Sequence, residues 1–272
     1  MLDPNGAGAY ASAMESQIDP ETALALLEWQ LEMGASEAIC DTPVDRFALD
    51  AAAPKPASSP AAASQPVPAV EPVDPVAEAR SMAQSAQDID GLRAALSAYD
   101  HCELKKGARN LVFSDGRPQA RVMVIGDAPG REEDREGRPF MGREGQLLDL
   151  MFEAIGLGRA EGEPLYLTTV LPWRPPQNRD PRPEEIAMML PFVQRHVELI
   201  APEVVILMGN ISCLAAMGRK GVVRLRGAWT TAFGRDAMPM CDPAYLLRNP
   251  TSKREAWQDL LMVQARLRKG AR

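Results

Sequence analysis

The chain has 272 residues, a formal net charge of −7 and 25% charged residues, and this length allows one sizeable hydrophobic core together with a tail. No run of 18 apolar residues and no basic-then-apolar leader occurs, so we expect neither a membrane span nor a secretory signal. Four cysteines are scattered without a CxxC pair, which argues against a disulfide framework or a zinc site and predicts a cytoplasmic protein.

Charge is divided unevenly along the chain. Residues 1–90 hold 3 Lys and Arg against 15 Asp and Glu, and residues 91–272 hold 27 against 22. The first part is acidic and the second mildly basic. A basic face is compatible with contacts to a nucleic-acid backbone, although so small an excess does not establish them.

The N-terminal third divides by composition into two segments. In residues 1–50, apolar residues at helical spacing predict one amphipathic helix within residues 20–39, with Pro20 at its start and Gly34 at its stop. Such a helix docks either on its own domain or on a protein partner, and the sequence leaves both open. Residues 51–76 are almost entirely Ala, Pro and Ser, which predicts a disordered linker.

The third segment, residues 77–272, is expected to form the folded domain. Residues 76–98 have a helical pattern with Asp90 as a candidate N-cap, and from residue 109 onward short apolar runs alternate with helical patterns. The predicted strands are residues 122–125, 165–171, 204–208, 229–233 and 238–241, and the predicted helices are 145–156, 184–199, 211–217 and 255–268. The alternation predicts an α/β fold, a three-layer α/β/α arrangement around a mainly parallel four-stranded sheet.

Polar or turn-forming residues follow each of the four main strands. Asp127 follows the first strand, the run 172–179 follows the second, Gly209-Asn210 follows the third, and the run 242–248 follows the fourth. Parallel strands present these ends at one edge of the sheet, where ligands bind in open α/β folds. Neither GxGxxG nor GxxxxGK[ST] occurs, so a nucleotide cofactor or nucleotide hydrolysis is not expected.

Three segments carry a resemblance to a known family. In chain order they are GDAPGREEDREGRPFMGREGQLLD, LTTVLPWRPPQNRDP and DPAYLLRNP. Together they resemble the uracil-DNA glycosylase superfamily, most closely the family 4 type and its bacterial relatives, over about residues 95–268. The resemblance implies a monomeric DNA repair enzyme that hydrolyses the N-glycosidic bond of uracil, or a related deaminated base, flipped out of DNA.

The resemblance also implies a role for each matching position. The catalytic positions, beside the sugar and the departing base, are Asp127, Asn178 and Asp242. The positions that bind the base, with Phe140 stacking on it, are Gly126, Ala128, Phe140 and Thr169. The positions that contact DNA are Gly142, Arg143, Arg224, Arg226 and Arg248.

One departure from the family pattern concerns its iron–sulfur cluster. Such a cluster needs about four thiolates, and only Cys102 remains of the four expected ligands. Tyr99, Trp173 and Met189 stand at the other three positions. We therefore expect no iron–sulfur cluster, no metal and no other cofactor.

Two further departures lie in the pocket. Asp242 stands where the family has His, and Thr169 where it has Asn. At 4 Å and an effective dielectric near 20, a carboxylate would oppose an anionic leaving base by about 4 kcal/mol, whereas a protonated Asp242 could donate a hydrogen bond. Three readings stay open: an active glycosylase; a glycosylase-fold protein that binds DNA or a modified base with weak or no excision; and a scaffold whose N-terminal helix recruits a partner.

Overall fold

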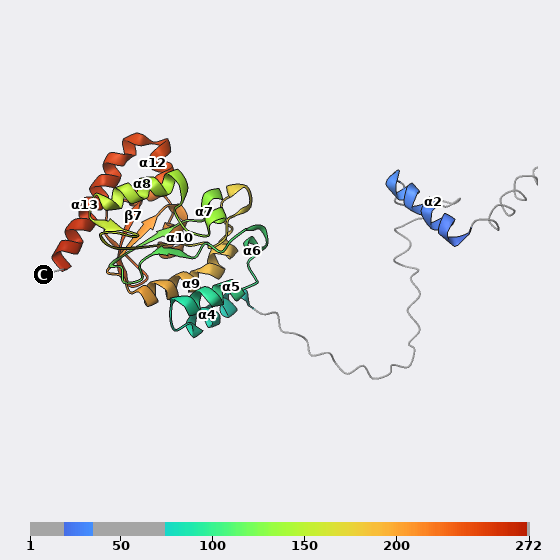
Figure 1. The fold of residues 1–272 in the computed structure, drawn as a ribbon, viewed down its shortest axis with the longest axis horizontal. Helices are drawn as coiled ribbons and strands as arrows, with labels where there is room; N and C mark the ends of the chain where they lie inside the picture. The colour runs from blue at the N-terminus through green and yellow to red at the C-terminus, as the bar shows by residue number, and fades with distance from the viewer. Residues whose placement is uncertain (1–18, 35–73, 271–272) are drawn as a thin grey trace, which may run out of the picture. The chain divides into compact units, whose positions relative to one another are not determined.

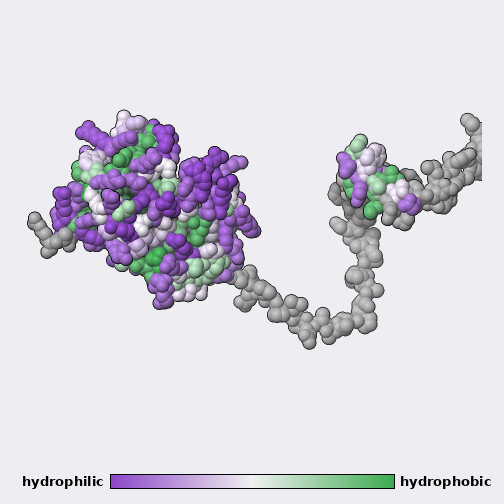
Figure 2. Space-filling view, viewed as in Figure 1, coloured by the Kyte–Doolittle hydropathy of each residue, from purple (hydrophilic) through white to green (hydrophobic). Residues whose placement is uncertain are grey.

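The computed structural model describes residues 19–34 and 74–270, and the chain divides into two units, Met1–Pro68 and Ala69–Arg272 (Figure 1). In the first unit the predicted helix is confirmed as α2 (Pro20–Glu32), where the Thr22 amide donates to Asp19 Oδ1 at 3.0 Å. Its large apolar side chains are mostly exposed, and hydrophobic residues show on α2 in Figure 2. Residues 51–73 of the predicted linker lie outside the described residues.

The second unit is built around one sheet with the strand order β1-β4-β2-β5-β7-β6, and β3 pairs with β4 beside it. Its strands are β1 (Ser114–Gly116), β2 (Val122–Gly126), β3 (Leu157–Gly158), β4 (Glu163–Thr169), β5 (Val204–Met208), β6 (Thr230–Ala232) and β7 (Arg235–Met240). The four inner strands, β4, β2, β5 and β7, run parallel, and β1 and β6 pair antiparallel at the two edges. The parallel core agrees with prediction. The sheet is wider than the four strands expected, because β1 and β6 pair at its edges and β3 pairs with β4.

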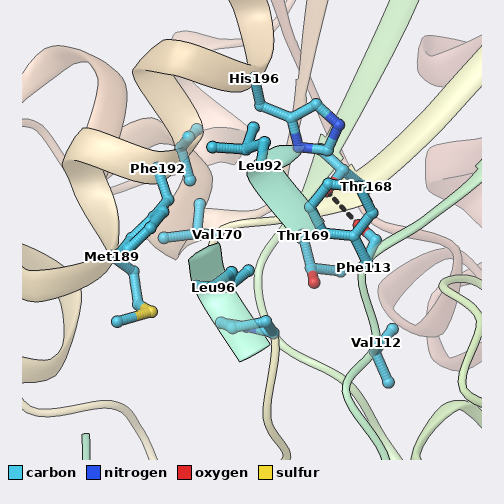
Figure 3. A pocket seen from close by; sticks show the side chains of 12 residues that line it. Leu92, Leu96, Val112, Phe113, Thr168, Thr169, Val170, Met189, Phe192 and His196 are labelled. Atoms are coloured by element: carbon cyan, nitrogen blue, oxygen red, sulfur yellow. Dashed lines mark hydrogen bonds between the residues drawn. The ribbon is translucent and has the colours of Figure 1, made fainter. Parts of the chain in front are cut away.

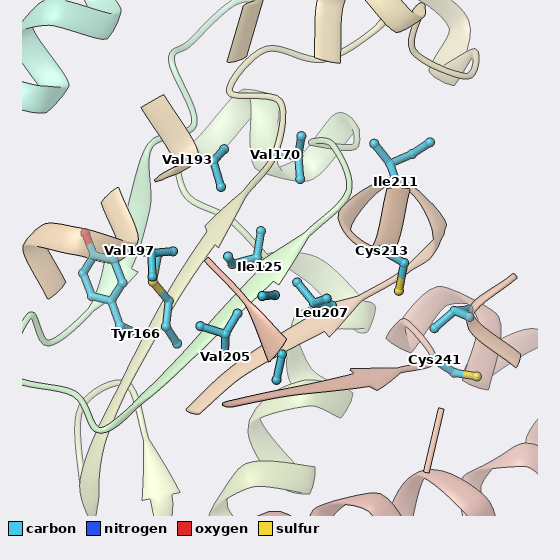
Figure 4. Packing of buried hydrophobic residues seen from close by; sticks show 14 of the residues in the cluster. Ile125, Tyr166, Val170, Val193, Val197, Val205, Leu207, Ile211, Cys213 and Cys241 are labelled. Carbon is cyan, nitrogen blue, oxygen red and sulfur yellow. The ribbon is translucent and has the colours of Figure 1, made fainter. Parts of the chain in front are cut away.

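Helices cover both faces of the sheet, which confirms the three layers. β2 and β5 are completely buried, as strands covered on both faces must be. On one face, Ile125 and Leu207 pack against Val193 and Val197 of α9 (Pro183–Ile200) and against α10 (Asn210–Met217) (Figure 4). The opposite face is covered by α8 (Gly142–Glu153) and α13 (Lys253–Gly270).

A second helical layer packs outside α9. The predicted helical stretch 76–98 is two helices, α4 (Pro75–Ser85) and α5 (Ile89–Ala98). The N-cap of α5 is Asp88, whose Oδ1 accepts the Gly91 amide at 2.7 Å, and not Asp90, which lies inside the first turn. Asp90 was the wrong choice because capping depends on the extended backbone at position 88.

Several short elements shape the loops between strands and helices. They are α6 (Leu104–Gly107), α7 (Arg131–Glu136), η1 (Pro176–Asn178), α11 (Val222–Leu225), α12 (Pro243–Arg248) and η2 (Pro250–Ser252). Of these, α7 was missed because its charged sequence has no apolar face to give a helical period. In the described part of the chain, no helix combines the length and apolar composition that membrane crossing requires.

His196 lies in the core and lines a small cavity between the sheet, α5 and α9, with a volume of about 20 Å³ (Figure 3). Its ring stacks on Phe113 with 4.6 Å between centroids, and its Nε2 is 2.8 Å from the Tyr166 hydroxyl. Burial lowers the pKa of His196 to about 3. The other histidine, His101, pairs with Glu78 on the surface at 2.8 Å, so neither histidine lies among the strand-end loops.

Candidate functional site

The carboxyl ends of the four parallel strands are aligned in one row. Gly126 of β2 pairs with Thr169 of β4 and Met208 of β5, and Met208 pairs with Met240 of β7. The loops that follow line a cleft of about 320 Å³. Eight residues predicted from the sequence line this cleft: Gly126, Asp127, Ala128, Phe140, Thr169, Asn178, Asp242 and Arg248.

Asp127 is held by the first turn of the neighbouring helix α10. Its Oδ1 accepts the Ser212 amide at 2.7 Å and its Oδ2 accepts the Asn210 amide at 3.0 Å. These amides have no partner inside α10, and a carboxylate at a helix N-terminus is favoured by the helix dipole. Gly209 permits this approach, because a Cβ at that position would lie 2.4 Å from the Asp127 carboxylate. The carboxylate therefore caps α10 from a different strand.

Asp127 lines the cleft, so the acceptor positions of its carboxylate that α10 does not occupy can bind a water molecule. Burial raises the pKa of Asp127, hydrogen bonds from the start of α10 oppose that rise, and the charge of Asp242 adds to it. The side chain is thus a partly desolvated base, which is the environment that acid–base chemistry uses.

Phe140 forms an aromatic wall of the cleft in a strained backbone conformation. Its φ is +53°, and the residue is 7% exposed. The ring lies directly against Gly126, where an added Cβ would come within 2.6 Å of the Phe140 Cζ. Glycine at position 126 is therefore needed for the ring to occupy this position, and the Gly126 backbone and the Phe140 ring form one continuous surface.

Thr169 and Asp242 present acceptor oxygens at the cleft. The Thr169 hydroxyl donates to the Leu171 carbonyl at 2.7 Å, so its single hydrogen is already used. Asp242 is the N-cap of α12, and its Oδ1 accepts the Tyr245 amide at 2.8 Å. At both positions the side chain therefore also forms a hydrogen bond with the backbone of a residue two or three positions further along the chain.

Sequence reasoning missed several charged residues of the cleft. They are Glu133, Glu144, Arg179 and Asp180. Desolvation at the cleft raises the pKa of Glu144, the charge of Asp242 raises it further, and Arg248 lowers it. Arg179 pairs with the buried Glu185, with 2.5 Å between Nη2 and Oε1. In the sequence, Glu133 lies seven residues before Phe140 and Glu144 four residues after it. That proximity is the signal that could have identified them.

The turn at residues 175–178 brings Asn178 to the cleft, and two of its residues have a positive φ. Gln177 and Asn178 both have a φ of +54°, a region that Asn tolerates better than most residues. The Asn178 Oδ1 accepts from Arg174 Nε at 2.8 Å. Its amide nitrogen is the part of the side chain left to donate.

The predicted DNA-contacting residues differ in how far their side chains are exposed. Arg143, Arg224 and Arg248 are exposed, and Gly142 begins α8 with a φ of +71°. Arg226 instead points inward, where Nη2 lies 2.5 Å from Oδ1 of the fully buried Asp259. The sequence could not reveal this partner, which is 33 residues away, so the prediction for Arg226 needs correction: its guanidinium supports the fold.

The loop before α11 is tied to the cleft through Asn210. The Asn210 Oδ1 accepts the Gly221 amide at 3.1 Å and the Val222 amide at 2.9 Å. The backbone amide of Asn210 donates to Asp127. The exposed cations Arg219 and Lys220 on this loop, and Arg224 within α11, therefore lie on a segment anchored beside the cleft.

A sequence profile of the Uracil DNA glycosylase superfamily matches residues 113–261, which include the cleft and both faces of the sheet. The chain belongs to this superfamily. Among curated members, the Type-4 uracil-DNA glycosylase of Sulfurisphaera tokodaii is 32% identical over 173 residues, 60% of this chain and 77% of that protein. The Type-4 uracil-DNA glycosylase of Pyrobaculum aerophilum is 34% identical over 184 residues, 64% of this chain and 92% of that protein.

Family 4 members of the superfamily carry an iron–sulfur cluster, and the four corresponding positions of this chain lie together. Tyr99, Cys102, Trp173 and Met189 belong to one buried apolar cluster. Only Cys102 could supply a thiolate, and burial raises the pKa of its thiol. Two aromatic rings and a thioether fill the space around it. These residues do not fit a cluster that needs about four thiolates.

Proposed function

We propose that this chain is a DNA glycosylase that hydrolyses the N-glycosidic bond of uracil, or of a related deaminated base, flipped out of DNA. The observation that carries the proposal is the placement of the Asp127 carboxylate and the Phe140 ring in one cleft at the carboxyl ends of the parallel strands. The family membership and the Type-4 uracil-DNA glycosylases among the relatives support it.

In the proposed reaction the extruded base stacks on Phe140, with Gly126 and Ala128 bounding it through their backbone and Thr169 at its edge. As the bond between the base nitrogen and C1′ breaks, its electron pair leaves with the base and C1′ gains positive charge. A water held by Asp127 attacks C1′ and passes a proton to the Asp127 carboxylate, the departing base anion takes up a proton from solvent, and Asn178 donates a hydrogen bond to the reacting groups. A carboxylate beside C1′ also stabilises the oxocarbenium-like transition state electrostatically.

DNA would be held by exposed cations around the cleft. Arg143, Arg224 and Arg248 would contact phosphates, and the Gly142 turn at the start of α8 would offer backbone amides. Such contacts fix the register of the duplex and make binding weaker at higher salt.

A second candidate function is binding of DNA or a modified base with weak or no excision. Asp242 and Thr169 favour it, because neither supplies the hydrogen-bond donor that a departing uracil anion would use. In this case the Asp242 carboxylate would leave the stacked base bound but intact.

Excision of uracil from a labelled duplex, read as strand scission after alkali, tests the proposal. We expect scission by the wild type and its loss in Asp127→Asn. Because this substitution also removes one acceptor from the start of α10, its thermal unfolding and DNA affinity must be measured alongside. Scission by a folded Asp127→Asn at the wild-type rate would remove Asp127 from the mechanism. Tight binding without scission by the wild type would favour the second function.

We assign this activity to a domain of residues 77–272 that acts as a cytoplasmic monomer without an iron–sulfur cluster, a metal or another cofactor. Residues 1–50 would serve a protein partner through α2, with residues 51–76, of which the last two begin α4, as the spacer. The exposed apolar side chains of α2 support the partner role. The buried thiols Cys102, Cys213 and Cys241 support a reducing compartment.

A further inference from the structure

We infer that Arg159, which none of the three sequence motifs contains, is a positioning residue that together with Glu133 holds the Phe140 ring in place for the flipped base. The inference rests on the proposed function, because it assigns Phe140 the role of stacking platform. Arg159 lies on the loop between β3 and β4, outside the loops that line the cleft.

Arg159 fixes the backbone carbonyl of Phe140. Its Nη2 donates to the Phe140 carbonyl at 2.6 Å and its Nη1 to the Pro139 carbonyl at 3.0 Å. The guanidinium is fixed in turn by two carboxylates, Asp115 at 2.8 Å and Asp149 at 2.7 Å. The side chain is 14% exposed. A planar fork with four such partners sets one orientation for the guanidinium.

Glu133 fixes the backbone amide of Phe140. Its Oε1 accepts the Phe140 amide at 3.0 Å, and its Oε2 accepts the Gly130 amide in a short hydrogen bond. Glu133 is itself buried, and burial raises the pKa of its carboxyl group. One carboxylate thus connects the platform to the loop that follows Asp127.

These contacts explain how Phe140 keeps a φ of +53°, a conformation that a bulky residue adopts only when its surroundings impose it. Gly145 completes the arrangement, because a Cβ there would lie 1.8 Å from the Phe140 carbonyl oxygen. With its amide and its carbonyl both fixed, the backbone directs the ring toward Gly126. Loss of the Arg159 fork would free the carbonyl and let the ring move away from the cleft.

A double-mutant cycle on excision tests whether Arg159 acts through Phe140. Base–aromatic stacking predicts that Phe140→Ala lowers kcat by about 5- to 150-fold. We expect Arg159→Gln to lower kcat in the same direction, and the double variant to be no slower than Phe140→Ala alone. Independent effects that multiply in the double variant would overturn the inference. Arg121→Gln is the matched control, since Arg121 also binds a carboxylate and a backbone carbonyl, Leu267 O at 2.8 Å.

Two readouts separate positioning from general stabilisation. Arg159→Lys keeps the charge near Asp115 and Asp149 but cannot fork to two carbonyls, so we expect near wild-type thermal stability with a reduced kcat. We also expect faster hydrogen exchange at the Phe140 amide in Arg159→Lys than in Arg121→Gln. Unchanged exchange would overturn the inference even if the wild type excises no uracil, and absence of excision alone would count against the proposed function.

Discussion

Replacing Arg226 by Met is expected to destabilise the domain by about 3–5 kcal/mol, because the fully buried Asp259 loses its partner charge. The wild-type guanidinium lies 2.5 and 2.8 Å from the two Asp259 oxygens and also donates to the Glu255 carbonyl at 2.6 Å. For a domain of about 200 residues this loss corresponds to roughly 6–20 °C in Tm. Urea unfolding followed by circular dichroism at pH 7 measures it.

The pH dependence of this loss has a definite sign. Burial already raises the pKa of Asp259, and Arg226 opposes that rise. Without Arg226 the folded-state pKa rises further above its unfolded value of 3.8, so protonation favours the folded variant. The stability deficit of Arg226→Met should therefore be small near pH 4 and widen as the pH rises toward 7.

Arg224→Met is the matched control, since Arg224 is exposed and lies two residues earlier, within α11. We expect it to change stability by no more than about 0.5 kcal/mol and to weaken DNA binding, with a salt slope smaller by about 1. If Arg226→Met were as stable as Arg224→Met and lost DNA affinity in the same way, the structural role of Arg226 would be refuted.

Three further predictions concern the cleft and the core. The charge of Asp242 raises the pKa of Asp127, so Asp242→Asn should move the acid limb of the pH profile of kcat/KM to lower pH; a limb that stays in place would exclude Asp127 as the titrating base. Gly126→Ala puts a Cβ 2.6 Å from the Phe140 ring and should lower kcat/KM by about a hundredfold, and an unchanged value would argue against the platform. His196 has a pKa of about 3 instead of 6.5 and stays neutral in the folded state. Because only the unfolded state binds a proton below pH 6.5, stability is full above pH 6.5 and should fall by about 2 kcal/mol between pH 6.5 and 5. Urea titrations that show no such fall, or the same fall in His196→Gln, would contradict this.

The order of the main elements could be predicted from local patterns. Short apolar runs such as 122–125 and 204–208 are buried on both faces, and a strand of that kind needs no knowledge of its neighbours to be recognised. The residues after each run could be placed at one rim because parallel strands share a direction. This is why Asp127 and Asp242 were predicted to lie together, whereas the place of Phe140 beside them came from the resemblance to the family.

Only the tertiary structure decided what those residues bind. Asp127 caps a helix that begins 83 residues later, Arg226 pairs with a carboxylate 33 residues away, and Arg159 reaches the Phe140 carbonyl from 19 residues downstream. Periodicity and turn chemistry act over a few residues, so they identify strands, helices and loops. The partner of a buried charge or a strained backbone is set by how distant loops meet in space, and no local pattern encodes that meeting.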